Sequence, residues 1–377
     1  MDFALDERQT LLRDSARRFI DNDYDFEQRR RLVEHDGGFS ARHWAQFAQL
    51  GWLGAGLPES VGGFGGGAIE TALIAEELGR GLVVEPFVGV AVLAAQALLH
   101  AASGSTTGPT LGVLIDGACL VIPALADAAG LSTRVHASVD GSLCVTGRKT
   151  LVPAGSQADR LLVSATEANG KSVLLLPVET PGLTRHAYRL IDGTPACDLA
   201  LDAVKIDPAM RIGAPGGAAA ALEFAQQHAG VAWCAQALGV MGRAIETTRD
   251  YLLQRHQFGV AIASFQALRH RLADMVIAHE QARATLHGAL AVLVSAGGPG
   301  PELARAVAIA KAQSGRSGRF IGAQAIQLHG GIGMTNEYVV GHCFKQLMVI
   351  DSMAGGTAAQ LRALAVGMSA TTKEQPA

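Results

Sequence analysis

The sequence predicts an α+β protein in which a helical region, an antiparallel β-sheet domain and a longer helical region follow one another. Apolar residues recur at intervals of three and four near both ends of the chain, whereas in the middle they alternate with polar residues. Strands and helices are therefore not interleaved, which excludes a βαβ fold such as a Rossmann domain. The 377 residues are enough for two or three packed units. We expect these units at residues 1–106, 107–213 and 214–377.

The N-terminal unit is expected to be helical. Asp6 and Gln9 form a helix-capping pattern. Apolar residues then follow at helical spacing: Leu12, Ala16, Phe19 and Ile20. The run Arg29–Arg31 is interpreted as a solvated helix face, and Gly79 is expected to end a later helix.

The middle unit is expected to form the sheet, because short alternating runs are separated by turn sequences. One such run contains Val135, Ala137 and Val139. Asp140-Gly141 and Asn169-Gly170 are dipeptides typical of tight turns, so each predicts a β-hairpin.

The C-terminal unit returns to the helical period. One predicted helix face contains Val231, Cys234, Leu238, Met241, Ile245, Thr248 and Leu252. A second contains Leu268, Leu272, Met275, Ala282, Leu286 and Leu293. Residues separated by three and four positions lie on one side of a helix, so both patterns predict long amphipathic helices. The turn Gly297–Pro301 predicts a third helix that runs toward Ala325.

Composition excludes several classes of function. The chain has 31 Lys and Arg against 34 Asp and Glu, so its net charge of −3 gives no electrostatic basis for nucleic-acid binding. Its five cysteines are scattered without a CxxC pair, which indicates reduced core residues rather than disulfides or zinc ligands. His329 and His342 have no spaced partners, so no metal site is expected. No leader-like start or apolar span of membrane length is present, and we expect a soluble cytoplasmic protein without a membrane segment.

Two short segments stand out as possible ligand-binding sites. The first is Arg255–Gly259, which is followed by Gln266. The second is Gln327–Gly331, in which adjacent glycines allow the backbone to approach a planar or phosphorylated ligand. Taken singly, both patterns are common, because arginines often cap helix ends and Gly-Gly pairs often form turns.

Together with the order of the units, these segments resemble the acyl-CoA dehydrogenase family over nearly the whole chain. The family's N-terminal pattern is matched by Gly51–Gly54, Pro58-Glu59, Gly62-Gly63 and Glu76–Gly79. The resemblance implies an N-terminal helical domain, a middle β domain and a C-terminal four-helix bundle. Within the family, Gln327–Tyr338 and Lys149–Val152 resemble the small-subunit type of two-chain bacterial enzymes such as pimeloyl-CoA dehydrogenase.

The resemblance implies an FAD cofactor that contacts two neighbouring subunits. In the family, the first segment lies near the pyrophosphate and the second near the adenine end. An arginine suits a diphosphate because it stays charged and donates several directed hydrogen bonds. The cofactor-binding residues implied here are Arg255, Phe258, Gln266, Gln327, Leu328, His329, Gly330, Gly331 and Thr357. An acyl-CoA substrate, an electron-transfer acceptor and an oligomer with homologous subunits are implied as well.

The family's catalytic glutamate is missing from both positions where it is expected. The family removes the α proton of an acyl thioester with a carboxylate, while the β hydrogen leaves as hydride to the flavin. One position is Gly355, where members commonly have a Glu-Gly-Thr sequence, and the other is Ala229. Asp351 and His228 are the remaining candidates for a displaced base. A lone Asp near a helix is more often a capping residue, and a lone His in an apolar helix is more often structural.

Two further segments depart from the family where it contacts the flavin ring. Ile122–Leu125 replaces a Thr-Glu-Pro loop, and Leu151–Pro153 replaces a Trp-Ile-Thr sequence. Both replacements remove side chains that would touch the isoalloxazine. We expect the acyl pocket to be lined by the N-terminal helices and by the region 222–232, which is rich in small apolar residues.

Three functional hypotheses follow from these observations. The first is FAD-dependent α,β-dehydrogenation of an acyl-CoA, with part of the site contributed by a partner. In the second, the chain is a catalytically silent scaffold that completes the FAD site of a homologous subunit. The third is a flavin oxidase or monooxygenase on the same fold, which needs no thioester base of this kind and which fold alone does not exclude.

Overall fold

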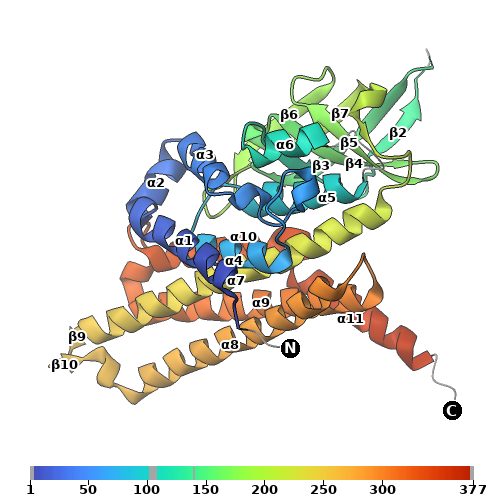
Figure 1. Cartoon of the computed structure of the whole chain (residues 1–377). Coiled ribbons are helices and arrows are strands. Elements are labelled where there is room, and N and C mark those ends of the chain that lie inside the picture. Colours follow the sequence, from blue (N-terminus) through green and yellow to red (C-terminus); the bar gives the residue numbers. More distant parts are fainter. Residues whose placement is uncertain (1–3, 102–107, 139–140, 374–377) are drawn as a thin grey trace.

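The computed structural model describes residues 4–101, 108–138 and 141–373, and it has a helical region, a sheet and a long helical region in the predicted order (Figure 1). The predicted boundary between residues 106 and 107 lies outside the described residues. Among the residues that are described, no helix has both the length and the apolar character needed to cross a bilayer.

The N-terminal region is helical, as predicted. Its α-helices are α1 (Glu7–Asp23), α2 (Phe26–Glu34), α3 (Ala41–Gln49), α4 (Ala68–Arg80), α5 (Ala95–Ala101) and α6 (Gly108–Ile115). Helix α6 lies within residues 107–213, which were expected to form the β domain, so the helical region extends past the predicted boundary. Shorter helical segments are η1 (Trp52–Gly54), η2 (Glu59–Val61) and the π-helical η3 (Val88–Ala94). The predicted capping pattern is confirmed, because the Asp6 side chain accepts a hydrogen bond from the Gln9 backbone at 2.7 Å and the Gln9 side chain accepts one from the Asp6 backbone.

The prediction that Gly79 ends a helix was wrong, because α4 continues through it to Arg80. Gly79 instead lies where α4 crosses the long helix α7 (Ala219–Gln254). A β-carbon at Gly79 would lie 2.0 Å from the carbonyl oxygen of Gln236. One at Gly239 on α7 would lie 1.8 Å from the carbonyl oxygen of Glu76. These two glycines therefore allow the helix backbones to approach each other closely.

The middle region forms one eight-stranded sheet with the strand order β6-β7-β3-β2-β4-β5-β8, and β1 pairs with β4. Its strands are β1 (Val121–Ala124), β2 (Arg134–Ala137), β3 (Leu143–Pro153), β4 (Arg160–Glu167), β5 (Gly170–Pro177), β6 (Leu183–Arg189), β7 (Pro195–Lys205) and β8 (Arg211–Ile212). Most neighbours are antiparallel, as predicted, but β4 pairs in parallel with β1 and, at one position, with β2.

Both predicted hairpins are present in the sheet. Ala137 of β2 pairs with Leu143 of β3, and Glu167 of β4 pairs with Gly170 of β5. Val139 and Asp140 of the first predicted hairpin lie outside the described residues. Local turn sequence was therefore sufficient to predict these two strand connections.

The C-terminal region consists of long helices. After α7 come α8 (Gln266–Ser295), α9 (Pro301–His329), α10 (Val339–Ser352) and α11 (Gly356–Lys373). The short hairpin of β9 (His256–Gln257) and β10 (Val260–Ala261) joins α7 to α8 and projects from one end of the bundle (Figure 1). The predicted faces are buried on α7 except at Ile245, and α9 extends past Ala325 to His329. All five cysteines are buried and unpaired, as expected of core residues.

Candidate functional site

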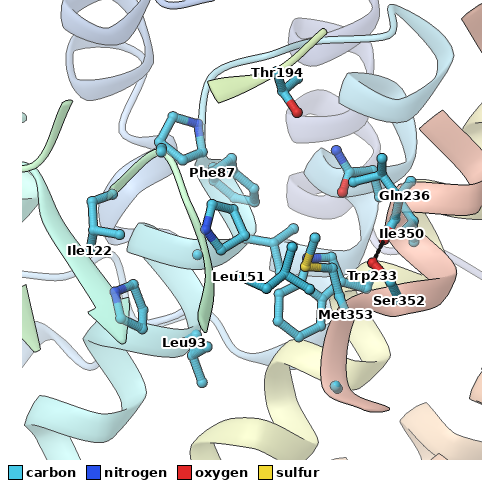
Figure 2. Close-up of a pocket in the computed structure, with 18 of the residues that line it drawn as sticks. Phe87, Leu93, Ile122, Leu151, Thr194, Trp233, Gln236, Ile350, Ser352 and Met353 are labelled. Carbon is cyan, nitrogen blue, oxygen red and sulfur yellow. Dashed lines mark hydrogen bonds between the residues drawn. The ribbon is translucent and has the colours of Figure 1, made fainter. Parts of the chain in front are cut away.

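A cavity of about 430 Å³ lies where the three regions meet. It is lined by the segment that follows α4, by loops of the sheet domain, by α7 and by the end of α10. Figure 2 shows Phe87 and Leu93 from the first region, Ile122 and Leu151 from the second, and Met353 from the third around this space. Side chains from distant parts of the sequence thus share one concave site, which is the usual setting of a ligand pocket.

The sheet domain contributes an apolar wall to this cavity. The lining residues from this wall are Ile122, Pro123, Leu125, Ala126, Leu151, Pro153 and Ala154. They come from the two segments that the sequence placed at a flavin ring. The structure thus brings these segments to the same cavity, with aliphatic and proline side chains in place of hydroxyl and aromatic groups.

A bulge in β3 positions Leu151 at the cavity. The pairing of β3 with β7 shifts register between Lys149 and Val152, and Leu151 has a left-handed φ of 51°. Asp198 Oδ1 accepts hydrogen bonds from the Leu151 backbone at 3.0 Å and from the Tyr188 hydroxyl at 2.9 Å. Burial, together with the hydrogen bond to Asp198, raises the pKa of Tyr188 to about 12. The carboxylate therefore holds the bulge in this strained conformation.

Polar side chains gather where the cavity meets the segment after α4. Glu85 accepts hydrogen bonds from the Tyr24 hydroxyl at 2.9 Å and from the Ser40 backbone at 3.2 Å. Asp192 Oδ1 accepts bonds from the backbone and hydroxyl of Thr194, at 3.0 and 2.7 Å. Burial raises the pKa of Asp192, and the hydrogen bonds from Thr194 oppose that rise.

Arg29 connects this polar end to all three regions of the chain. Its Nε donates to the Leu82 carbonyl and its Nη2 to the Asp192 carbonyl, both at 3.1 Å. Its Nη1 lies 2.9 Å from Nδ1 of His342. Because Nε2 of His342 faces the Asn336 carbonyl at 2.9 Å and must donate to it, Nδ1 is the acceptor for Arg29.

The interpretation of Arg29–Arg31 as a solvated face was wrong for Arg29, which is fully buried, although Arg31 is exposed. The guanidinium can be buried because backbone carbonyls and an imidazole accept its hydrogen bonds. The signal in the sequence was its position on α2, three residues from both Phe26 and Leu32, on the apolar face of the helix.

The two positions of the missing glutamate have different environments. Gly355 lines the cavity and has a φ of 96°, a left-handed conformation that favours glycine. Ala229 is fully buried in α7 and does not line the cavity. Of the predicted lining region 222–232, only Gln226 contributes, and the wall continues instead to Trp233 and Gln236 (Figure 2).

Neither candidate for a displaced base lines the cavity. Asp351 Oδ1 accepts hydrogen bonds from the backbone and hydroxyl of Thr357, at 3.0 and 2.7 Å, so the carboxylate caps the start of α11. His228 packs edge-to-face on Phe224 with ring centroids 4.7 Å apart. Burial lowers the pKa of His228 to about 4. Both side chains thus have structural surroundings in this chain.

Most of the implied cofactor residues lie together at the far end of the helical bundle. Arg255 and Phe258 belong to the connection between α7 and α8, and Gln266 is the first residue of α8. Tyr251, one turn before this connection, stacks on His329 with ring centroids 4.4 Å apart. The end of α9 and the α7–α8 connection are therefore neighbours, although some 70 residues separate them in the sequence.

The residues of the second segment do not all face solvent. Leu328 and His329 are buried, whereas Gln327, Gly330 and Gly331 are exposed. A β-carbon added at either glycine would meet nothing within 4 Å. The outer side of this segment is therefore open to a ligand or to another chain.

The hairpin tip is exposed and strained. Phe258 is 91% exposed, and both Phe258 and Gly259 have positive φ angles, of 54° and 81°. A two-residue turn with this geometry matches the twist of a hairpin, but it favours glycine or asparagine over phenylalanine. Arg255 is also exposed, and its guanidinium has no hydrogen-bond or ion-pair partner among the described residues.

Of the implied cofactor residues, Thr357 lies apart from this far end, two residues after the cavity-lining Gly355. Gln236 of α7 lines the cavity, and Arg255 caps the C-terminal end of the same helix. The helix rise between these two residues is about 28 Å. Gly355 and Thr357 lie at the cavity end of the chain, on either side of the start of α11. One chain therefore does not bring all of these residues around a single point.

Two family models match the chain. Acyl-CoA dehydrogenase, N-terminal domain, matches residues 6–118, and Acyl-CoA dehydrogenase, C-terminal domain, matches residues 215–369. Between them they cover the predicted helical regions on both sides of the sheet.

Similar proteins extend over nearly the full chain. It is 27% identical over 372 residues to acryloyl-CoA reductase (NADH) of Anaerotignum propionicum, a match that covers 94% of this chain and 93% of the relative. The solved ChsE4-ChsE5 complex from Mycobacterium tuberculosis is 27% identical, with a TM-score of 0.90 and complete coverage of both chains. The FAD complex of PigA shares the fold at 24% identity, with a TM-score of 0.88 and coverage of 98% and 99%. The predicted resemblance is confirmed, and the chain belongs to the acyl-CoA dehydrogenase family.

Proposed function

We propose that this chain is a subunit of an FAD-dependent acyl-CoA dehydrogenase, which forms a double bond between the α and β carbons of an acyl thioester. The observation that carries the proposal is the separation of the cavity, at Gln236, from the implied cofactor segment at Arg255, which lies about 28 Å away along α7. A lined cavity at one end and an exposed, unpartnered cofactor segment at the other suit an assembly of homologous chains. In it, the far end of one chain completes the cavity of the next.

The residues at the far end fit the phosphate and adenine parts of FAD. The exposed guanidinium of Arg255 can donate to a pyrophosphate, and Gln327 is exposed near the end of α9. Gly330 and Gly331 leave room for a planar ring against the backbone. When bound, FAD would accept the hydride that leaves the β carbon and pass its electrons to an electron-transfer acceptor.

The apolar cavity fits the ring and the acyl chain. Leu151 and Pro153 would pack against a flat, largely apolar group, and Trp233 and Met353 would exclude water from the reacting carbons. This chain has no free carboxylate at Gly355 to take the α proton. Two carboxylates line the cavity, but Glu85 and Asp192 lie at its polar end and already accept hydrogen bonds from Tyr24, Ser40 and Thr194. We therefore infer that the base comes from elsewhere in the assembly.

A second reading, a silent half of a two-chain enzyme, is favoured by one specific observation. Both usual glutamate positions lack a carboxylate. Asp351 is hydrogen-bonded to Thr357 and His228 packs on Phe224, so neither side chain replaces the glutamate at the cavity. The similarity to the ChsE4-ChsE5 complex is consistent with a partner of a different sequence. In this reading the chain supplies Arg255 and its neighbours to the partner's cofactor.

Anaerobic titration with acyl-CoA thioesters tests both readings, with flavin absorbance as the measurement. If the flavin bleaches with this chain alone, the chain has its own base and the silent reading fails. If it bleaches only after the homologous partner is added, this chain is the base-less half. If neither preparation holds flavin, the proposed function itself fails.

A further inference from the structure

One buried amide at the cavity lacks a hydrogen-bond partner. Gln346 of α10 lines the cavity and is 3% exposed. Its Nε2 donates to the Val83 carbonyl at 3.3 Å, whereas its Oε1 has no partner among the described residues. A carbonyl accepts but does not donate, so the amide cannot be turned around to exchange the two atoms. The unpaired atom is therefore an acceptor.

A second acceptor lies at the same end of the cavity. Asp192 is 4% exposed, and its Oδ1 accepts hydrogen bonds from the backbone and hydroxyl of Thr194. Arg29 ties the Asp192 backbone to the carbonyl of Leu82, which precedes the Val83 carbonyl held by Gln346. Asp192 and Gln346 are therefore linked through one short stretch of backbone.

This polar end contrasts with the rest of the cavity. Glu85 adds another carboxylate there, but both of its oxygens already have hydrogen-bond or ion-pair partners. Elsewhere the walls are mostly apolar, with Leu93, Ile122 and Met353 around the open space in Figure 2, although Gln226, Gln236 and Ser352 also line the cavity. From Gln346 to Ser352, next to the turn that carries Gly355, α10 rises about 9 Å. The free Gln346 acceptor is thus several carbon–carbon bonds away from the Gly355 position.

We infer that this cavity binds an acyl group with an apolar body and a hydrogen-bond donor, such as a hydroxyl, at its far end. The inference rests on the proposed function, since it takes the ligand to be an acyl thioester. A plain acyl chain would leave the Gln346 oxygen buried and unpaired, which is unfavourable. A terminal carboxylate would place a negative charge beside Asp192 and Glu85, without a donor for either. A donor such as a hydroxyl satisfies the unpaired Gln346 oxygen without adding a negative charge beside the two carboxylates.

Calorimetric titration of the full chain, with the flavin and partner that copurify with it, tests this selectivity. The ligands are matched CoA thioesters of six to twelve carbons that end in a methyl, a hydroxyl or a carboxylate. At one chain length or more, the ω-hydroxyacyl-CoA should bind at least about tenfold more tightly than the plain acyl-CoA. The ω-carboxyacyl-CoA should bind the most weakly.

Gln346→Met should remove the preference, because methionine has a similar volume but no acceptor of comparable strength. Gln227→Met is the matched control. Gln227 is also a buried glutamine with an unpartnered Oε1, but it does not line the cavity, so its variant should keep the preference. If the Gln346 variant does not fold, Asp192→Asn supplies the test. It should strengthen binding of the ω-carboxyacyl-CoA severalfold, because the negative charge is gone and the Oδ1 acceptor remains.

The outcomes separate this inference from the proposed function. If no thioester binds at any chain length, the proposed function fails. If thioesters bind but the hydroxyl gives no preference at any length, the inference is overturned and the dehydrogenase proposal stands. If Gln346→Met lowers flavin content instead, and affects all thioesters equally, the free oxygen faces the cofactor and the inference is also overturned.

Discussion

The cavity and the far end of the helical bundle differ in how many of their polar groups have hydrogen-bond partners within this chain. At the cavity, buried polar groups are mostly paired within the chain, as the hydrogen bonds of Arg29 to Leu82 and Asp192 illustrate. At the far end, Arg255 is exposed and its guanidinium has no partner within the described part of the chain, and Phe258 is 91% exposed on a strained turn. Hydrophobic and charged groups left open in this manner are typical of an interaction site.

This difference indicates which contacts belong to folding and which belong to assembly. Removing a buried cation leaves its partners unsatisfied inside the protein, so it should weaken the fold. Removing an exposed group with no internal partner should leave the fold unchanged and affect only what binds there. The two regions can therefore be distinguished by variants that alter one property and not the other.

The largest effect is expected for Arg29→Met. Loss of the guanidinium leaves the Leu82 and Asp192 carbonyls and His342 without their donor, so the free energy of unfolding should fall by about 3 kcal/mol or more. Urea denaturation measures this change. The control is Arg31→Met, two residues away and exposed, which should change stability by less than about 0.5 kcal/mol. A loss below about 1 kcal/mol for Arg29→Met would show that this network contributes little.

For Arg255→Ala we expect a loss of cofactor binding without a loss of stability. Hydrogen bonds to a charged group contribute about 1.5–3 kcal/mol, so FAD affinity of the assembly should fall roughly tenfold to a hundredfold. Flavin absorbance after dialysis measures the retained cofactor. Arg305→Ala, an exposed arginine near the start of α9, is the matched control and should retain its flavin. Equal flavin retention in both variants would contradict a cofactor role for the far end.

The stability of the fold should also respond to acid through His228 of α7. Its folded pKa of about 4 lies below the ordinary value of 6.5, so the unfolded chain takes up the proton first as pH falls. The stability contribution is therefore present above about pH 6.5 and is lost progressively toward pH 4. We expect a loss of about 2 kcal/mol between pH 8 and pH 5.

His228→Leu provides the comparison for this acid response. Other buried histidines titrate in both proteins, so the difference between the two unfolding curves isolates His228. That difference should grow in favour of the variant as pH falls. Parallel curves would mean that His228 is as easily protonated in the folded state as in the unfolded chain.

The smallest effect is expected for Gly355→Ala. A φ of 96° is unfavourable for any residue with a β-carbon, so thermal unfolding should show a loss of about 1 kcal/mol. Gly331→Ala at the far end is the control, because its β-carbon would meet open space. If both variants are equally stable, the backbone at Gly355 is free to relax, and a glutamate could be accommodated there more easily than the present conformation implies.

Local sequence patterns predicted much of the fold. The Asp6 cap, the hairpin at Asn169-Gly170 and the buried faces of α7 each depend on residues a few positions apart, and each is present in the structure. The prediction for Gly79 was wrong because the local sequence does not distinguish a glycine that ends a helix from one that allows a second helix to pack closely. The close contact with Gln236 that distinguishes the two cases lies more than 150 residues away.

The site was predicted in pieces rather than as an arrangement. Gly355 and Leu151 lie at one cavity, as the family resemblance implied, but Ala229 does not line it. Arg29 was missed entirely, since a cation on an amphipathic helix usually faces water. The roles of Arg255 and Gln327 in binding remain predictions.

Helix and strand positions follow from the period of apolar residues and from turn chemistry, which act over a few residues and can be read directly along the chain. Burial of Arg29, stacking of Tyr251 on His329 and the free oxygen of Gln346 depend on contacts between distant segments. Such contacts exist only after the three regions pack together, because packing decides which polar groups lose water and which find partners. The separation of the cavity from the far end likewise arises from the length and direction of α7 in the folded chain.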